Sequence, residues 1–180
     1  MIRMEPDKRI SQDYLEQQRK LHENPNYGVA SIGYAPLVKE LLSTYKFESL
    51  CDYGAGKQRL REQLEKLGNA PAEYYPYDPV FPEYGKPQPA ELVCCIDVLE
   101  HIEIDSLDVV LRELRDLVLE VGFFTVHTGP AIKTLPDGRN AHLIQQPSSW
   151  WLPKLCEHFE ISQLNRTDEG FWVLVTPKDE

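Results

Sequence analysis

A glycine-containing turn is the clearest chemical signal in the chain. The segment Asp52-Tyr53-Gly54-Ala55-Gly56-Lys57 stands between an expected strand at 47–51 and an expected helix at 58–68. Glycine lets the backbone turn sharply and come close to a ligand, and the start of a helix offers N–H groups without a helical partner. Asp52 could pair with an ammonium group of that ligand. An ordinary strand-to-helix turn is the alternative.

The turn departs from the dinucleotide fingerprint. The third glycine of that fingerprint, which brings helix and strand close around a pyrophosphate, is replaced by Arg59. A nucleoside joined to an amino acid does not need that approach, so such a ligand is favoured over NAD. Asp78 ends the next expected strand, 24 residues beyond Gly54. In nucleotide-binding α/β folds an acidic residue about 20 residues on accepts hydrogen bonds from ribose hydroxyls. A surface aspartate before a turn proline is the alternative.

Ionisable residues follow a third expected strand. Residues 91–96 form an apolar run typical of a buried central strand, and Asp97, Glu100 and His101 come directly after it. Ligands of open α/β sheets bind at the carboxyl ends of strands. A histidine there could take a proton from an acceptor hydroxyl or amine, so His101, His142 and His127 are the candidate catalytic residues. A hydrogen-bonded structural role is the alternative for each.

No metal site is predicted. Asp97, His101 and His142 could supply ligands, but no recognised ligand spacing connects them. The four cysteines form no CxxC pair, and the adjacent Cys94 and Cys95 are expected on opposite faces of a strand. All four are expected as reduced, mostly buried thiols in a cytoplasmic protein.

Helix and strand patterns alternate, which predicts an α/β sheet with helices on its faces. Ser11 is the expected N-cap of a first helix and Asp105 of a later one, and Pro153 should lie near the first turn of the last. Residues 23–36 are expected as a loop. The expected helices are 11–23, 36–45, 58–68, 106–120 and 149–158; the expected strands are 47–51, 73–77, 91–96 and 122–126, with a hairpin at 159–164 and 171–175 turned at 167–170.

Composition narrows the partners. The 180 residues include 42% hydrophobic residues, which is enough for a core. The net charge is −10, whereas nucleic-acid binding needs clustered Lys and Arg. The N-terminal sequence lacks the apolar core of a signal peptide, and no apolar run reaches membrane-spanning length. We therefore expect a small-molecule partner, with nucleic acid unlikely and no membrane contact.

Residues 47–128 resemble the core of class I S-adenosylmethionine-dependent methyltransferases. LCDYGAGK is similar to their glycine-rich first motif, YPYDP to the acidic end of their second strand, and AELVCCIDVLEHIE to their fourth-strand motif. The tail GPAIKTLPDGRNAHLIQQPSSWWLPKLCEHF resembles the substrate-side loop and helix of the small-molecule branch. The resemblance implies a Rossmann-like, mostly parallel sheet with S-adenosylmethionine as the cofactor.

The resemblance also implies roles for single residues. The methionine moiety would be held by Asp52, Tyr53 and the Gly54-Ala55-Gly56 backbone. Asp78 would hold the ribose, Pro79 and Val80 the adenine, and Asp97 and Val98 would line the cofactor, while His101 faces the acceptor. The candidate acceptor contacts are Tyr27, Arg139 and Trp150; Lys133, like Arg139, could neutralise an anionic acceptor, and Trp150 has packing as its alternative.

One departure from the family is plain. Only residues 79–90, rich in proline, separate the second expected strand from the next, too few for the helix and third strand that the family places there. The sheet is therefore expected to lack that edge unit, and Phe81 or Tyr84 is the candidate to replace the missing wall of the adenine pocket. We expect one domain over 1–180, with a helical cap region at 1–46, a cofactor-binding core at 47–128, and an acceptor-side loop, helix and hairpin at 129–180.

Methyl transfer to an oxygen or nitrogen of a small polar acceptor is the expected function. A methyltransferase acting on nucleic acid or protein is one alternative, although no NPPY-like motif follows the expected strand at 91–96. A catalytically silent module that binds S-adenosylmethionine is the other. The acceptor and the oligomeric state are left open.

Overall fold

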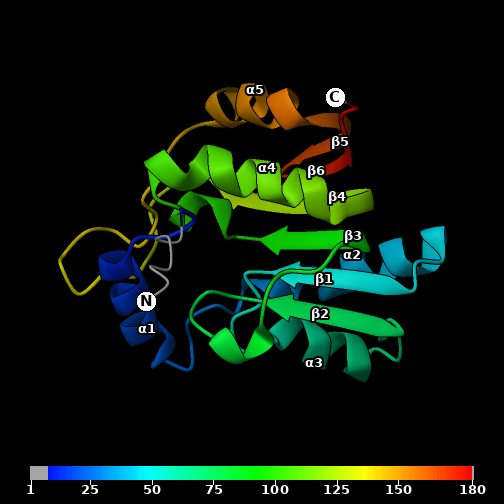
Figure 1. Ribbon diagram of the computed structural model, residues 1–180, viewed down its shortest axis with the longest axis horizontal. Helices are drawn as coiled ribbons and strands as arrows, with labels where there is room; N and C mark the ends of the chain where they lie inside the picture. Colours follow the sequence, from blue (N-terminus) through cyan, green and yellow to red (C-terminus); the bar gives the residue numbers. More distant parts are fainter. Residues whose placement is uncertain (1–7, 180) are drawn as a thin grey trace, which may run out of the picture.

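The computed structural model describes residues 8–179. A six-stranded sheet forms its centre, in the order β2-β1-β3-β4-β6-β5 (Figure 1). Strands β2, β1, β3 and β4 are parallel, whereas β6 runs antiparallel to both β4 and β5. The strands are β1 Ser49–Tyr53, β2 Glu73–Tyr77, β3 Ala90–Ile96, β4 Val118–His127, β5 Phe159–Arg166 and β6 Gly170–Pro177. The predicted mixed sheet with its C-terminal antiparallel hairpin is confirmed.

The missing edge unit is also confirmed. Between β2 and β3 the chain forms only a 3-10 turn, η1 Pro82–Tyr84, so β2 is the edge of the sheet. The connection crosses β1 to reach β3, which is the short path expected from the sequence. The carboxyl ends of β1, β2 and β3 still meet at one edge, so losing the unit leaves the ligand-binding edge intact.

Two apolar layers hold the helices to the sheet. On one face, α4 (Leu107–Leu117) and α5 (Ser148–His158) pack through residues such as Leu114 and Trp151. On the other face, α2 (Ala30–Tyr45) and α3 (Arg59–Lys66) pack through Val38 and Leu60. Cys94 lies in one layer and Cys95 in the other, as strand alternation requires. Cys51 is buried with them, and Cys156 is exposed.

Helices α2 and α4 differ most from the sequence expectation. Helix α2 begins at Ala30 instead of residue 36 and contains Pro36, because burying Ala35 and Val38 against the sheet outweighs the poor helix propensity of its first turns. Helix α4 ends at Leu117, and β4 begins at the next residue. Asp105 lies in a 3-10 turn (η3, Ile104–Ser106) and does not cap α4.

Helix α1 (Gln12–His22) lies across the ends of the parallel strands (Figure 1). Ser11 caps it as predicted, since its hydroxyl accepts a hydrogen bond from the N–H of Tyr14. The Tyr14 hydroxyl donates to the carbonyl of His101 at 2.5 Å, and Glu103 accepts bonds from both the N–H and the hydroxyl of Ser11. These contacts attach α1 to the segment that follows β3.

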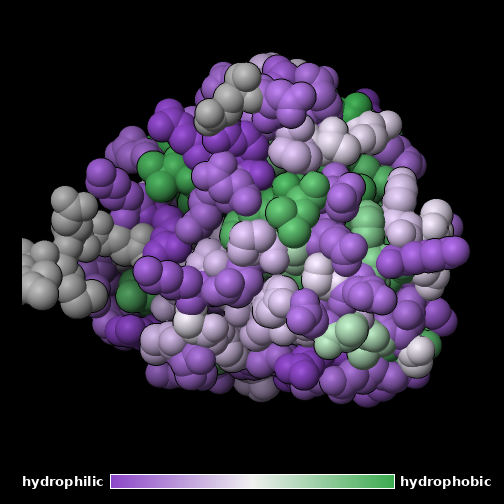
Figure 2. All heavy atoms as spheres, turned by 45° about the vertical axis from the view of Figure 1, so that its right-hand side comes forward, coloured by the Kyte–Doolittle hydropathy of each residue, from purple (hydrophilic) through white to green (hydrophobic). Residues whose placement is uncertain are grey.

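The visible surface is mainly hydrophilic, with small separate hydrophobic patches (Figure 2). Among residues 8–179 no helix is both long and apolar enough to cross a membrane.

Candidate functional site

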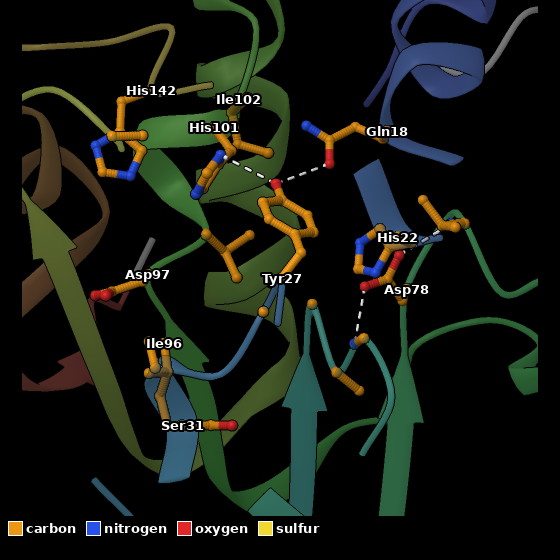
Figure 3. Close-up of a pocket in the computed structure, with 18 of the residues that line it drawn as sticks. Gln18, His22, Tyr27, Ser31, Asp78, Ile96, Asp97, His101, Ile102 and His142 are labelled. Carbon is orange, nitrogen blue, oxygen red and sulfur yellow. Dashed lines mark hydrogen bonds between the residues drawn. The ribbon is translucent and has the colours of Figure 1, made fainter. Parts of the chain in front are cut away.

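A cavity of about 410 Å³ opens at the carboxyl ends of the parallel strands. Its wall comes from α1, the loop before α2, the ends of β1, β2 and β3, and the loop that follows β4 (Figure 3). Of the residues singled out from the sequence, the cavity wall includes Tyr27, Asp52, Tyr53, Gly54, Ala55, Gly56, Asp78, Pro79, Val80, Asp97, Val98, His101, His127, Lys133 and His142. The sequence motifs therefore converge on one space.

The glycine turn is held closed by its own backbone. Gly54 has a φ of 80° and Gly56 of 51°, both in the left-handed region that favours glycine. The N–H groups of Gly54 and Ala55 donate to the Tyr77 carbonyl at 2.7 and 2.9 Å, and the Gly56 N–H donates to Asp78 Oδ2 at 2.9 Å. Three amides that a phosphate-binding loop would leave open are thus bonded within the protein, which agrees with the preference for a ligand without a pyrophosphate.

Asp52 is a buried carboxylate on the cavity wall. It is 4% exposed, and burial raises its pKa to about 7 although a hydrogen bond from the Tyr74 hydroxyl favours the charged form. A cationic group placed beside it would return the pKa towards its ordinary value, because an opposite charge favours ionisation. Asp52 therefore fits the ammonium-binding role expected of it.

Asp78 is held in the cavity wall by two backbone hydrogen bonds. Its Oδ2 accepts the Gly56 N–H and its Oδ1 accepts the Val80 N–H, each at 2.9 Å, which fixes the carboxylate at the cavity wall. Burial raises its pKa. Each carboxylate oxygen has further lone pairs that a pair of vicinal hydroxyls can use.

His22 lies beside Asp78 in the cavity and was not expected from the sequence (Figure 3). Burial lowers its pKa to about 4, and its buried Nδ1 has no hydrogen-bond partner. A neutral imidazole with an unused nitrogen at this place can bond a ribose or a base. His22 ends α1 without any local motif, so only the packing of α1 reveals it.

Phe81 and Tyr84 do not themselves line the cavity among the described residues. Their rings stack on each other with centroids 5.3 Å apart, and the Phe81 ring meets the His22 ring edge-on at 5.3 Å. The Tyr84 hydroxyl donates to the Gly56 carbonyl at 2.9 Å. The two rings therefore contact His22 and the glycine turn from outside the cavity. The cavity wall at this place is formed by His22, Pro79 and Val80.

Three histidines gather at the other end of the cavity. The His142 ring lies with its centroid 4.7 Å from those of His101 and His127. Burial and the neighbouring His142 lower the pKa of His101 to about 3, and burial also lowers the pKa of His142. Both rings are therefore neutral at physiological pH.

Backbone carbonyls set which nitrogen of each ring carries the proton. His101 Nδ1 lies 2.8 Å from the Ala141 carbonyl, and His142 Nδ1 lies 2.7 Å from the Gly129 carbonyl. A carbonyl only accepts, so Nδ1 donates in both rings and Nε2 keeps a lone pair. In His127 the arrangement is reversed, since Nδ1 accepts the Gly129 N–H at 3.1 Å.

Tyr27 separates the two ends of the cavity (Figure 3). Its hydroxyl donates to Gln18 Oε1 at 3.0 Å and lies 3.4 Å from His101 Nδ1. Gln18 comes from α1 and also lines the cavity. Tyr27 lies in the cavity wall, and Gln18 is an addition that no sequence pattern indicated.

Two candidate acceptor contacts lie elsewhere. Arg139 is bonded to Asp137 at 2.8 Å, and this pairing lowers the pKa of Asp137 to about 2. Trp150 meets Trp151 edge-on and carries the Lys154 ammonium 4.5 Å above its ring. Neither Arg139 nor Trp150 is among the described residues of the cavity wall; Trp150 packs, and Arg139 finds its partner two residues away.

Asp97 and Glu100 bring acidic groups to the histidine end. Asp97 adopts a φ of 50°, which is uncommon outside glycine, and exchanges hydrogen bonds with Thr125 at 2.8 and 2.5 Å. Glu100 is fully buried, and its Oε1 accepts the His127 N–H at 2.9 Å. Burial and then the proximity of Asp97 raise the pKa of Glu100 well above its usual range.

Comparison with solved structures identifies the fold. A 1,6-didemethyltoxoflavin-N1-methyltransferase from Burkholderia thailandensis, solved with S-adenosylhomocysteine, superposes with a TM-score of 0.61 at 14% identity over 93% of this chain and 90% of its own. DhpI in complex with S-adenosylhomocysteine gives 0.57 at 14% over 95% and 100%. The magnesium protoporphyrin IX methyltransferase of Synechocystis PCC 6803 gives 0.56 at 14% over 97% and 98%. No family model and no curated protein matches the sequence. The chain has the fold of class I S-adenosylmethionine-dependent methyltransferases.

Proposed function

We propose that this chain, which has a methyltransferase fold, binds S-adenosylmethionine and transfers its methyl group to an oxygen or nitrogen of a small polar acceptor. One observation carries the proposal: a single cavity has Asp52 and Asp78 at one end and the histidines at the other. The first end suits the amino acid and ribose of the cofactor, and the second suits a polar acceptor.

The cofactor end offers contacts for the ammonium group, the ribose, the adenine and the methionine chain of S-adenosylmethionine. Asp52 would bind the ammonium group and Asp78 the ribose hydroxyls. Pro79 and Val80 would contact the adenine together with His22, and Tyr53 and the Gly54–Gly56 turn would follow the methionine chain. The side chain of Tyr53 is already bonded to Glu113 at 2.6 Å, so only its backbone remains for this purpose.

The chemistry asks the protein to align two reactants and to accept a proton. The bound cofactor supplies an activated methyl group on a sulfonium. The walls of the cavity hold the acceptor nucleophile in line with that methyl group. His101 or His142 then takes the proton of the acceptor at Nε2, because carbonyl bonds keep Nδ1 protonated in both rings.

A small acceptor fits the molecule better than a macromolecule. The net charge of −10 disfavours nucleic acid, and the histidines lie inside a cavity that α1 covers. A silent cofactor-binding module is the remaining alternative, in which S-adenosylmethionine binds and no labelled product forms.

Ligand binding to the whole chain tests the proposal. At about 100 times its dissociation constant, S-adenosylhomocysteine should stabilise the protein by about 2.7 kcal/mol. For a chain of this size the melting temperature should rise by roughly 5 to 11 °C. A rise with NAD and none with S-adenosylhomocysteine or S-adenosylmethionine contradicts the proposal.

Asp78→Asn tests the cofactor assignment. The variant should weaken S-adenosylhomocysteine binding by about 1 to 3 kcal/mol in calorimetry, because the ribose loses a charged acceptor. Asp137→Asn, whose carboxylate lies outside the cavity wall, is the matched control and should bind normally. Equal affinities in both variants contradict the assignment. Transfer of a labelled methyl group to pooled small polar compounds then distinguishes an enzyme from a silent module.

A further inference from the structure

Glu100 has a carboxylate oxygen that nothing in the protein satisfies. The residue is fully buried, and Oε1 accepts the His127 N–H, but Oε2 has no hydrogen-bond partner. A buried polar atom without a partner costs free energy, and in native proteins it requires an explanation such as a bound ion or a catalytic role. The acidic neighbour Asp97 makes the position still less favourable for an isolated carboxylate.

Two imidazole nitrogens lie beside this carboxylate. A carboxylate oxygen of Glu100 and one ring nitrogen each from His101 and His142 all lie within 4.8 Å of one another. The Nδ1 atoms of both rings are bonded to the carbonyls of Ala141 and Gly129. Histidines that bind metals are usually held in this way, with one nitrogen bonded to a carbonyl and the other free to coordinate.

We propose that Glu100, His101 and His142 form a binding site for a divalent transition-metal ion. Three atoms that are at most 4.8 Å apart lie within about 2.8 Å of a common point. Nitrogen and oxygen ligands hold Zn²⁺ at about 2.0 to 2.2 Å, so each ligand atom needs to move by roughly 0.6 to 0.8 Å to coordinate an ion there. Two imidazoles and one carboxylate suit Zn²⁺, Fe²⁺ or Mn²⁺, with further positions left open for water or another ligand. Glu100 takes the place that the sequence suggested for Asp97.

The ion would face the acceptor, a role that rests on the proposed function. His101 and His142 line the cavity, so an open coordination position points to the space where the acceptor binds. A cation there lowers the pKa of an acceptor hydroxyl, whose proton passes to water. The acceptor oxygen then forms the bond to the methyl carbon, the carbon–sulfur bond breaks, and sulfur keeps the electron pair. When the ion is bound, His101 and His142 are ligands, and water accepts the proton that one of them would accept in the metal-free protein.

Titration with Co²⁺ tests the site without an activity assay. The full chain, treated with a chelator and then freed of it, should bind one Co²⁺ and develop visible absorption bands. Glu100→Gln keeps the size of the side chain and an acceptor for the His127 N–H. This variant and His142→Ala should each weaken Co²⁺ binding about 100-fold or more. That loss exceeds what is typical for residues that only hydrogen-bond to the metal ligands.

The chain supplies its own control. Asp108, Glu157 and His158 also bring ligand atoms within 4.8 Å of one another, but both carboxylates are exposed. Asp108→Asn and Glu157→Gln should leave Co²⁺ binding unchanged. No binding by the wild type, or undiminished binding by both Glu100→Gln and His142→Ala, overturns the proposal.

Parallel calorimetry with S-adenosylhomocysteine separates this inference from the proposed function and shows that each variant is folded. Co²⁺ binding without S-adenosylhomocysteine binding supports the metal site and contradicts methyl transfer. S-adenosylhomocysteine binding without Co²⁺ binding contradicts the metal site alone.

Discussion

Replacing Asp52 by asparagine should make the protein more stable and less able to bind its ligand. Asparagine keeps an acceptor for the Tyr74 hydroxyl and removes a charge that burial disfavours. Asp52 is 4% exposed, so solvent screens that charge little. The gain should depend on pH, because only the aspartate titrates.

The size of the effect follows from the pKa of Asp52, which burial raises from 3.8 to about 7. The folded state then holds a proton between those values that the unfolded state has released, so this carboxylate destabilises the fold as the pH rises from about 4 to about 7. From pH 5 to about pH 7 the folded state holds this proton and the unfolded state does not. Two pH units of that difference lower the free energy of unfolding by about 3 kcal/mol. The stability advantage of Asp52→Asn should therefore grow by about that amount over this interval.

Urea denaturation of both proteins at pH 5 and pH 8, without ligand, measures the difference. Calorimetry at pH 8 should show that the same variant binds S-adenosylhomocysteine more weakly, because the ammonium group loses its counter-charge. A stability difference that is the same at both pH values refutes the electrostatic reasoning. Unchanged affinity refutes the ammonium contact alone.

Two further variants test the scaffold of the site. Gly54→Ala should lower the free energy of unfolding by about 1 to 3 kcal/mol, because the new Cβ falls on the Val98 side chain and the φ of 80° is unfavourable for alanine. Gly138→Ala is its control, since Gly138 also has a positive φ but open space around it, and equal losses in urea denaturation would exclude the Val98 contact as a cause. Ser11→Ala should cost about 1 kcal/mol and speed amide hydrogen exchange in the first turn of α1, because it removes the cap and the bond to Glu103; unchanged exchange would show that α1 is held by its other contacts.

The sheet could be predicted because its strands carry strong local patterns. The apolar run before Asp97 and the glycine turn after β1 each identify a strand end, and parallel strands bring such ends to one edge. The start of α2 could not be predicted, because Gly33 and Pro36 indicate a loop locally and only contact with the sheet overrides them. Local propensity decides little where a helix is buried.

The site was predictable to the same extent. Asp52 lies near the end of β1, and Asp78 and Asp97 directly follow β2 and β3, so all three could be predicted to lie at this edge. His22 and Gln18 reach the cavity only through the packing of α1, which no motif indicates. Arg139 was a candidate because its positive charge could neutralise an anionic acceptor, but Asp137 satisfies that charge. Polarity along the chain does not show which partner a side chain will find.

The shortened sheet has a consequence for solubility. Without the third-strand unit, β2 presents its backbone at the edge of the sheet, where an open row of N–H and C=O groups invites a strand from another molecule. Pro76 stands inside β2 and has no N–H to offer, and β5 at the opposite edge carries a register shift between Ile161 and Gln163. A proline at an edge and an irregular ladder both oppose continued pairing. The chain can therefore dispense with a covering strand without becoming a template for aggregation.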